Sequence, residues 1–293
     1  LMTKLLPLYV QAGEMQTGRI ARLLSHVSAH LVLLAGAVFM LLPFAWMLLT
    51  AIRPPEEILS GSLNPIPLRF YGFENVSQAL SLAPMHQFMI NGAIVCIGIL
   101  VVQLLVAIPT AYALAKLEFR GRSLFFGLVI AGLSIPIHVP ALPLYLGLAH
   151  FSLLDTYFAM MLPFFLSVFA IFLFRQVFKQ FPDEILQAAR VDGLGEMGIL
   201  WRIVVPSAWP AISAFSIFSI VAHWNDLYWP MIVVQRLEYA PPPLGMLFFA
   251  GSELGTNYGS LMAGAALITM PLVILFLLAR RNFVQGITMT GIK

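Results

Sequence analysis

Charged residues are scarce in this chain. Lys, Arg, Asp and Glu make up 10% of the 293 residues, whereas 60% are hydrophobic. A soluble domain carries roughly 25% charged residues, and its core could not bury so much apolar surface. A lipid bilayer can, so the composition indicates an integral membrane protein. The formal net charge of +3 is too small to suggest a nucleic-acid partner.

Patterns for cysteine, nucleotide and metal chemistry are missing as well. Cys96 is the only cysteine, which excludes an internal disulfide and a Cys-based metal site. No G-x-x-x-x-G-K-S/T stretch is present to cradle nucleotide phosphates. The six histidines are scattered without paired ligand spacing, and no nucleophile motif accompanies them. We therefore expect no catalytic residue, metal or cofactor in this chain.

Long runs without charge are what the sequence offers instead. A transmembrane helix needs about 20 mostly apolar residues, and six runs meet this length. Each contains or borders a proline, which membrane helices tolerate where neighbours satisfy the freed backbone groups. The predicted fold is an all-α integral membrane protein with six transmembrane helices, at about 30–52, 88–114, 124–147, 156–174, 207–230 and 259–279.

Lys and Arg are unevenly distributed between the two ends of these spans. With the N-terminus in the cytoplasm, thirteen of the 16 lie on that side, whereas Arg53, Arg69 and Arg236 lie outside. Because cytoplasmic loops carry an excess of Lys and Arg, both termini are expected in the cytoplasm. The expected parts are a cytoplasmic N-terminal segment (1–28), a membrane domain (29–280) and a cytoplasmic C-terminal tail (281–293).

One short polar stretch, EILQAARVDG at residues 184–193, lies between the fourth and fifth predicted spans. Pro182 suits the first position of a helix, and the acids after it suit the first turn. Asp192 and Gly193 form a turn signal, after which a second amphipathic segment leads to Pro206. We expect a helix–turn–helix hairpin on the cytoplasmic membrane surface. Composition alone leaves an ordinary connecting loop equally open.

The order of residues here resembles a known motif. Residues 181–212 resemble the "EAA" loop of importer-type ABC transporter permeases, whose pattern is E-A-A-x-x-D-G, a variable stretch and a proline. Ala188, Ala189, Asp192, Gly193 and Pro206 fall at the positions of this pattern. FRGRS (119–123), WNDLYWP (224–230) and the terminal FVQGITMTGIK resemble carbohydrate-type permeases related to the maltose transporter, in particular the shorter, six-helix subunit. The resemblance covers nearly the whole chain, from about residue 29 to residue 293. It implies a multi-pass permease of the bacterial inner (cytoplasmic) membrane.

The resemblance also implies partners. The permease would join a second permease subunit, two cytoplasmic ATP-binding subunits that hold ATP and Mg, and a periplasmic or lipid-anchored solute-binding protein. Closure of the ATP-binding subunits would push the helix at 183–193 and shift spans four and five between inward- and outward-open states. The residues implied to make this contact lie in the loop 181–206 and are Glu184, Gln187, Ala188, Ala189, Asp192, Gly193 and Pro206.

Gln187 departs from the family pattern, which has glutamate at this position. In the family, that glutamate helps to anchor the loop to the ATP-binding subunit. Glutamine keeps hydrogen-bonding capacity but cannot make a charge-assisted bond, which is roughly twice as strong as a neutral one. Either Glu184, one helical turn earlier, carries the ionic contact, or the partner's surface has changed. Gly193 has two compatible roles, a plain C-cap and the bend of the hairpin.

Polar residues within and beside the spans are candidates for the solute path. Asn91, Gln103 and His223 lie inside spans, where polar groups are costly. His138 lies in IPIHVPALP, whose three prolines should break span three, and irregular backbone at membrane depth faces protein or a water-filled cavity. A histidine bonded to a nearby carbonyl is the alternative. HWNDLYWP contains aromatic rings and polar side chains of the kind that bind sugars. The alternative is that it forms an aromatic belt at the membrane interface. The candidates are His138, Trp224, Asn225, Asp226 and Tyr228.

The distribution of cations bears on the solute. No Lys or Arg lies inside a predicted span, which favours a neutral sugar, oligosaccharide or polyol. Arg53 and Arg69 at the outer mouth leave glycerol phosphate and acidic oligosaccharides open. The alternative from another class is an ion-coupled secondary transporter, which would want an inverted repeat and buried ionisable residues. Only Asp226 comes close to that requirement.

Overall fold

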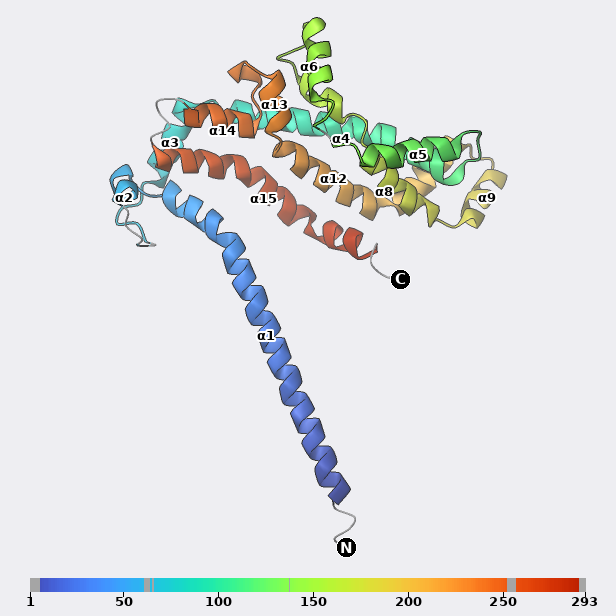
Figure 1. Ribbon diagram of the computed structural model, residues 1–293, viewed down its shortest axis with the longest axis horizontal. Coiled ribbons are helices and arrows are strands. Elements are labelled where there is room, and N and C mark those ends of the chain that lie inside the picture. Colours follow the sequence, from blue (N-terminus) through green and yellow to red (C-terminus); the bar gives the residue numbers. More distant parts are fainter. Residues whose placement is uncertain (1–5, 61–63, 65, 137, 252–256, 290–293) are drawn as a thin grey trace.

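The computed structural model describes residues 6–60, 64, 66–136, 138–251 and 257–289, and its regular elements are all helices (Figure 1). Three helical segments are long and apolar enough to cross a membrane: His26–Ala51 within α1 (Leu6–Ala51), α4 (Met85–Lys116), and Tyr258–Ala279 within α15 (Tyr258–Met289). Two bent helix pairs raise the number of candidate spans to as many as five. The expectation of an all-α membrane protein is therefore confirmed.

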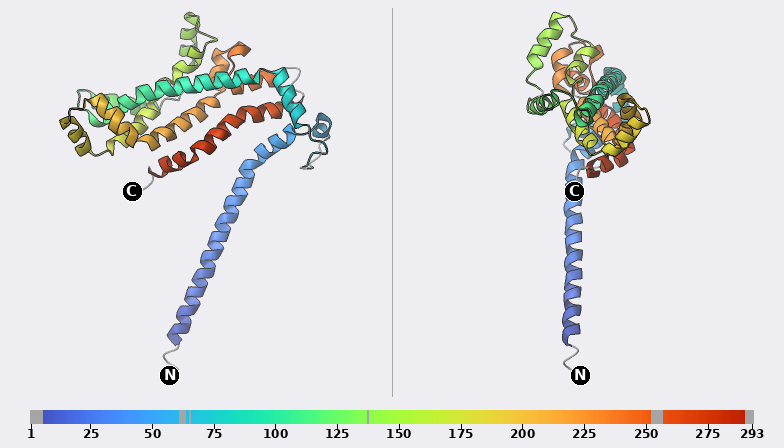
Figure 2. Two further views of the ribbon diagram at one scale, coloured as in Figure 1. Left: turned by 180° about the vertical axis from the view of Figure 1, so that it is seen from behind. Right: turned by 90° about the vertical axis from the view of Figure 1, so that its right-hand side faces the viewer.

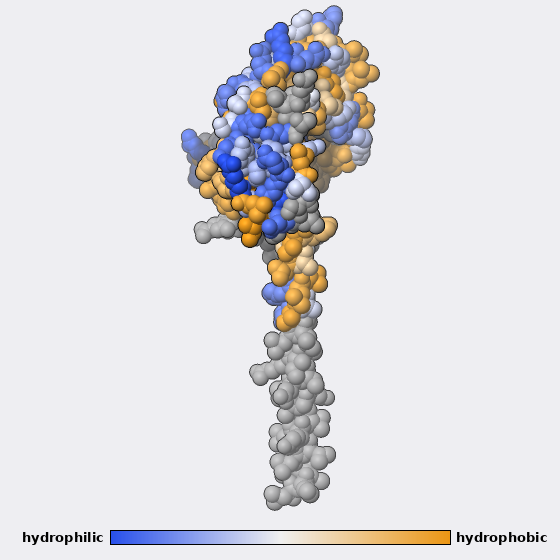
Figure 3. Space-filling view, turned by 90° about the vertical axis from the view of Figure 1, so that its left-hand side faces the viewer, coloured by the Kyte–Doolittle hydropathy of each residue, from blue (hydrophilic) through white to orange (hydrophobic). Residues whose placement is uncertain are grey.

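The long helices form a slanted layer. α4, α12 (Trp209–Trp224) and α15 run side by side (Figures 1 and 2). The C-terminal end of α1 contacts α15, whereas the N-terminal part of α1 points away from the other helices (Figures 1 and 2). No residue in the most apolar window of α1 is buried within the described chain. Figure 3 shows hydrophilic residues gathered at the end of the body near α2 and mostly hydrophobic ones on the described part of α1. α2 (Pro55–Leu59) and α3 (Gly72–Leu82) connect α1 to α4, and η4 (Leu237–Tyr239) and α14 (Pro242–Gly251) precede α15.

The third predicted span is not one helix. The expected segment 124–147 is divided between α5 (Arg122–Leu133) and α6 (Ala141–His150), and α6 stands away from the layer (Figures 1 and 2). Pro136 and Pro140 lie in the break, where each removes a backbone donor. The predicted break within this span is therefore confirmed.

The fourth and fifth predicted spans are also interrupted. The fourth consists of α7 (Tyr157–Met161), η2 (Leu162–Phe164) and α8 (Val168–Lys179), with a bend of 47°. The fifth was expected to reach residue 230, but α12 ends at Trp224 and α13 (Tyr228–Val233) begins a new helix. Asp226 Oδ1 accepts the backbone N–H of Trp229 at 3.4 Å, and such a local side-chain bond competes with the continuation of α12. Trp224 and Tyr228, four residues apart, would lie on the same face of one continuous helix. They do not, because they belong to two different helices.

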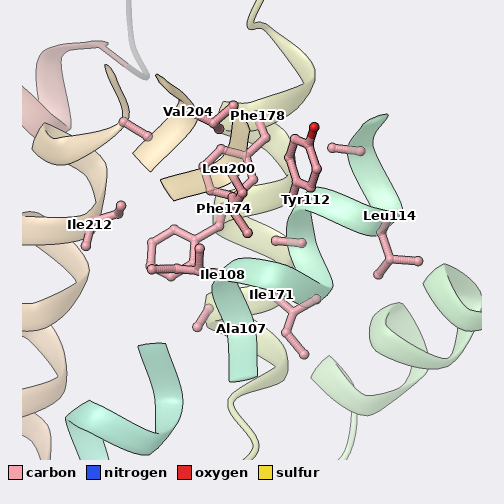
Figure 4. Close-up of a cluster of buried hydrophobic side chains, with 14 of the residues drawn as sticks. Ala107, Ile108, Tyr112, Leu114, Ile171, Phe174, Phe178, Leu200, Val204 and Ile212 are labelled. Atoms are coloured by element: carbon pink, nitrogen blue, oxygen red, sulfur yellow. The ribbon is translucent and has the colours of Figure 1, made fainter. Parts of the chain in front are cut away.

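Two apolar clusters hold the body together. The cluster in Figure 4 joins α4, α8, α12 and the segment before α12, with Ile108, Phe174 and Leu200 among its members. The second cluster lies at the other end of α4, where Met85 and Phe88 are fully buried. Each end of α4 thus has its own core, and α4 is the element common to both.

Gly245 should be sensitive to any added side chain. A Cβ at Gly245 would lie 2.3 Å from the ring of Phe88, whereas a Cβ at Gly127 would meet nothing within 4 Å. We expect Gly245→Ala to destabilise the protein by about 1–3 kcal/mol through overpacking. Gly127→Ala should be neutral or gain up to about 1 kcal/mol from helix propensity. The stability of both variants can be measured by heating the protein in detergent with a fluorogenic maleimide, which reacts with the buried Cys96 as the protein unfolds. Equal unfolding midpoints in the two variants would contradict the packing argument.

Candidate functional site

The polar stretch between spans four and five folds as the predicted hairpin. α9 (Asp183–Val191) is followed by α10 (Glu196–Ile199), the π-helix η3 (Leu200–Val204) and α11 (Val205–Ser207). Pro182 was expected at the first helical position but is the N-cap, in an extended conformation with ψ 129°. The fixed φ of proline, here −61°, suits both positions, so the sequence signal did not separate them.

Gly193 ends α9 through a double hydrogen bond. Its N–H donates to Arg190 O, and the N–H of Leu194 donates to Ala189 O, both at 3.0 Å, which is a Schellman motif. Gly193 has φ +84°, a left-handed conformation that side chains rarely adopt. The C-cap role of Gly193 is thus present in the structure, and it turns the chain sharply toward α10.

α9 has a buried face and an exposed face. Leu186 and Ala189 are 1% and 6% exposed and belong to the cluster around α4 and α8. On the outer side, Ile185 and Val191 leave 46% and 87% of their surface exposed. The outer face is therefore an uncovered, partly apolar surface, and Glu184, Gln187, Ala188 and Asp192 of this segment are exposed as well.

Polar contacts tie the hairpin to the end of α4. Lys116 Nζ lies 2.6 Å from both Phe181 O and Asp183 Oδ1. The hydroxyl of Tyr112 donates to Glu196 at 2.6 Å, and Arg190 Nε donates to the other carboxylate oxygen at 2.8 Å. The bond to Glu196 raises the pKa of Arg190 above its ordinary value. Sequence reasoning missed the contacts of Lys116 and Tyr112 because they join residues far apart in the chain.

Pro206 lies where the hairpin passes into α12. The backbone N–H of Val205 donates to Leu200 O, which closes the π turn immediately before the proline. A π turn fits this position, because proline clashes with the carbonyl four residues earlier in a regular α-helix. The segment Glu196–Ser207 then meets α12 at a bend of 79°.

A polar cavity of about 550 Å³ separates α9 from the end of α4. Gln187 faces this cavity, whose lining is mainly charged. The charged lining residues are Lys116, Glu118, Arg122, Lys179, Asp183 and Arg190. Four bases and two acids thus line the same cavity as Gln187, and two of the bases, Lys116 and Arg190, are paired with Asp183 and Glu196.

A second cavity, here called the outer cavity, measures about 190 Å³ and lies beside α13. It brings together three of the predicted solute-path residues, His138, Asp226 and Tyr228, and adds His223. The rings of His138 and Tyr228 meet edge to face, with centroids 4.4 Å apart. His138 and Tyr228 are far apart in sequence, and the breaks that follow α5 and α12 allow them to meet.

Two predicted solute-path residues lie outside the lining of the outer cavity. Trp224 is 7% exposed, and its indole N–H donates to Ile268 O of α15 at 3.1 Å. Asn225 is exposed and donates to Val221 O within its own helix end at 2.8 Å. Their placement indicates helix packing and helix capping respectively.

Comparison with known proteins places the chain in a family. Residues 103–289 match the family described as "Binding-protein-dependent transport system inner membrane component". The arabinooligosaccharides transport system permease protein AraQ of Bacillus subtilis is 32% identical over 255 residues, which cover 86% of this chain and 90% of that protein. The sn-glycerol-3-phosphate transport system permease protein UgpE of Yersinia pestis is 29% identical over 268 residues, covering 89% and 95%.

The fold is also shared with a solved structure. A chain of a bacterial ABC transporter involved in the import of the acidic polysaccharide alginate superposes with a TM-score of 0.79 at 23% identity, covering 89% of this chain and 97% of that one. The family's permeases are non-catalytic membrane subunits without a cofactor, and ATP is bound by partner subunits. The chain therefore belongs to the binding-protein-dependent inner membrane components and is a multi-pass permease subunit of an ABC importer.

Proposed function

We propose that this chain forms half of the translocation pathway for a sugar, oligosaccharide or polyol and couples to a separate ATP-binding subunit through α9. The observation that supports the coupling role is that α9 has one buried face and one exposed apolar face. Leu186 and Ala189 anchor it in the core around α4, whereas Ile185 and Val191 leave an apolar outer face uncovered. A helix built in this way offers its outer face to a partner while its inner face passes movement to the bundle.

The ties to α4 extend the path of that movement. Lys116 holds the start of α9, and Tyr112 holds α10 through Glu196. Closure of two ATP-binding subunits against α9 would therefore move α4 together with α8 and α12. The proposed contact residues are those of the loop 181–206: Glu184, Gln187, Ala188, Ala189, Asp192, Gly193 and Pro206.

The proposed membrane topology has six spans with both termini in the cytoplasm. The segments are α1, α4, α5 with α6, α7 with α8, α12 and α15, and the Lys and Arg distribution supports their orientation. The proposed parts remain 1–28, 29–280 and 281–293. α15 continues as a helix to Met289, so the tail begins helical, and residues 290–293 lie outside the described residues.

The solute is proposed to be neutral. Asp226 lines the outer cavity together with His138 and Tyr228, and no Lys or Arg is among its lining residues in the described chain. An anion would meet an acid there without a fixed cation. The similarity to an arabinooligosaccharide permease supports a carbohydrate, whereas the similarity to a glycerol-3-phosphate permease keeps that anion as the second candidate. The family assignment removes the ion-coupled secondary transporter.

The proposed partners are a second permease, two ATP-binding subunits, a periplasmic or lipid-anchored solute-binding protein and membrane lipid. The test is to purify the chain with these partners and measure ATP hydrolysis stimulated by the loaded binding protein. The panel contains neutral mono- and oligosaccharides, polyols, glycerol phosphate and acidic oligosaccharides. Stimulation by neutral sugars alone supports the proposal, and stimulation by glycerol phosphate alone favours the second candidate.

Lys116 should control how firmly α9 is held. Lys116→Met removes the bonds to Phe181 O and Asp183, and bonds to a charged group are worth about 1.5–3 kcal/mol. The Asp183 share is smaller because that side chain is 69% exposed. We expect faster tryptic cleavage after Arg190 and a lower ratio of transport to ATP hydrolysis. Lys179→Met is the matched control, because Lys179 lines the same cavity without an ion pair in the described chain; equal effects would contradict the role of Lys116.

Glu184 and Gln187 should differ in their contribution to ATPase docking. If Glu184 replaces the family glutamate, Glu184→Ala should weaken co-purification of the ATP-binding subunit more than Gln187→Ala does. A charge-assisted contact is worth about 1.5–3 kcal/mol and a neutral one roughly 1 kcal/mol. Retention of the partner over a salt series measures the difference. Identical salt sensitivity would show instead that the partner's surface has adapted to glutamine.

The outer cavity should affect transport more than the neighbouring surface does. We expect Tyr228→Phe and Asp226→Asn to raise the KM for the solute, because a site built around hydroxyls loses a partner in each variant. Asn225→Ala removes a neighbouring side chain that does not line the cavity and should leave KM unchanged. Uptake into vesicles with loaded binding protein measures all three. Silent changes at 226 and 228 would mean that HWNDLYWP is an interfacial anchor.

A further inference from the structure

The outer cavity has a larger neighbour along α12. This inner cavity measures about 550 Å³, and its lining includes Phe169 and Phe215 from α8 and α12. Its lining is mainly apolar, with phenylalanine the most frequent residue. The residues that line both cavities are Pro163, Phe164, Ala222 and His223. We call these four residues, which border both spaces, the wall between them.

The centre of the wall is a contact between two rings. Phe164 and His223 lie with their centroids 4.5 Å apart and their planes tilted by 55°. Phe164 is the last residue of η2, at the bend of span four, and His223 lies in the last turn of α12. Both rings are thus carried by the ends of helical segments, where the adjoining backbone is irregular.

Gln103 of α4 holds both sides of this wall. Its Nε2 donates to Phe164 O at 2.9 Å and lies 3.4 Å from His223 Nε2. Its Oε1 accepts a bond from Ser219 at 2.7 Å, so the amide contacts η2 and α12 together. The Gln103 side chain is 4% exposed. A buried amide satisfied on both sides fixes its neighbours, because an unpaired polar group at this depth is costly.

We propose that Phe164 and His223 form the constriction between the outer and inner cavities of the solute path, and that Gln103 is the residue that positions it. The assignment of a solute to this path rests on the proposed function, whereas the wall itself does not. A molecule that passes from Tyr228 toward Phe215 has to separate the two rings. The bend between η2 and α8 allows this separation without a change within either helix.

The test is thiol labelling of the complete importer in proteoliposomes, with Cys96→Ala as background. Tyr228→Cys reports the outer cavity and Phe169→Cys reports the inner cavity. A membrane-impermeant cationic methanethiosulfonate is added from the side that reaches position 228, without ATP. We expect position 228 to react at least about tenfold faster than position 169. Phe164→Ala should then raise the rate at position 169 several-fold.

Phe218→Ala is the matched control for the wall. Phe218 lines only the inner cavity and packs on Phe169, so its loss loosens the surroundings of the reporter without opening the wall. Phe164→Leu serves as a milder substitution if Phe164→Ala does not fold, and a smaller acceleration is expected. Equal labelling at 228 and 169, or equal acceleration by Phe218→Ala and Phe164→Ala, would overturn the constriction.

Gln103→Met tests the positioning role with a side chain of similar length and no amide. We expect it to accelerate labelling at position 169 as Phe164→Ala does. Asn91→Leu is its control, because Asn91 is also a fully buried amide of α4 but bonds to Glu238 O and Ala240 O. The same acceleration in both variants would mean that Gln103 only stabilises the bundle.

Labelling requires no solute, so the two proposals fail separately. A wall that limits labelling while no sugar stimulates ATP hydrolysis overturns only the proposed substrate. Unrestricted labelling at position 169 together with normal sugar uptake overturns only the constriction.

Discussion

Backbone groups at membrane depth need hydrogen-bond partners, and this constraint shapes the rest of the structure. Several short or irregular segments accept a hydrogen bond from a side chain of another element. Gln103 bonds to Phe164 O, Trp229 bonds to Ala159 O at 2.8 Å, and Asn91 bonds to two carbonyls before α14. Because these donors come from other elements, the irregular segments are also the places where separate helices are joined.

The same breaks position the candidate solute path. A continuous fifth span would place Tyr228 on the stripe of Trp224, but the new helix at α13 turns Tyr228 toward His138. The cost of interrupting a helix is offset by the caps and side-chain donors at the break. Irregular backbone and the polar residues of the outer cavity thus have one structural origin.

Local signals in the sequence predicted local structure well. The prolines of IPIHVPALP predicted the break in span three, and Asp192 with Gly193 predicted the turn after α9. The end of α12 was missed because aromatic and apolar residues continue past it, whereas the local bond to Asp226 involves a single side chain. The meeting of Gln103, Phe164 and His223 could not be read from any local pattern, since their contacts depend on packing between distant segments. The same holds for Lys116 and the start of α9.

The position of α1 has a consequence for biosynthesis. α1 is made before α15, which is its principal neighbour within the described chain. During most of synthesis, α1 therefore has no intrachain surface on which to pack, and its apolar residues meet lipid. Until α15 is made, insertion of α1 must be stable through hydrophobicity alone, which fits a segment of high hydropathy with so little burial. Helix packing at this end of the bundle is a late, post-insertion event.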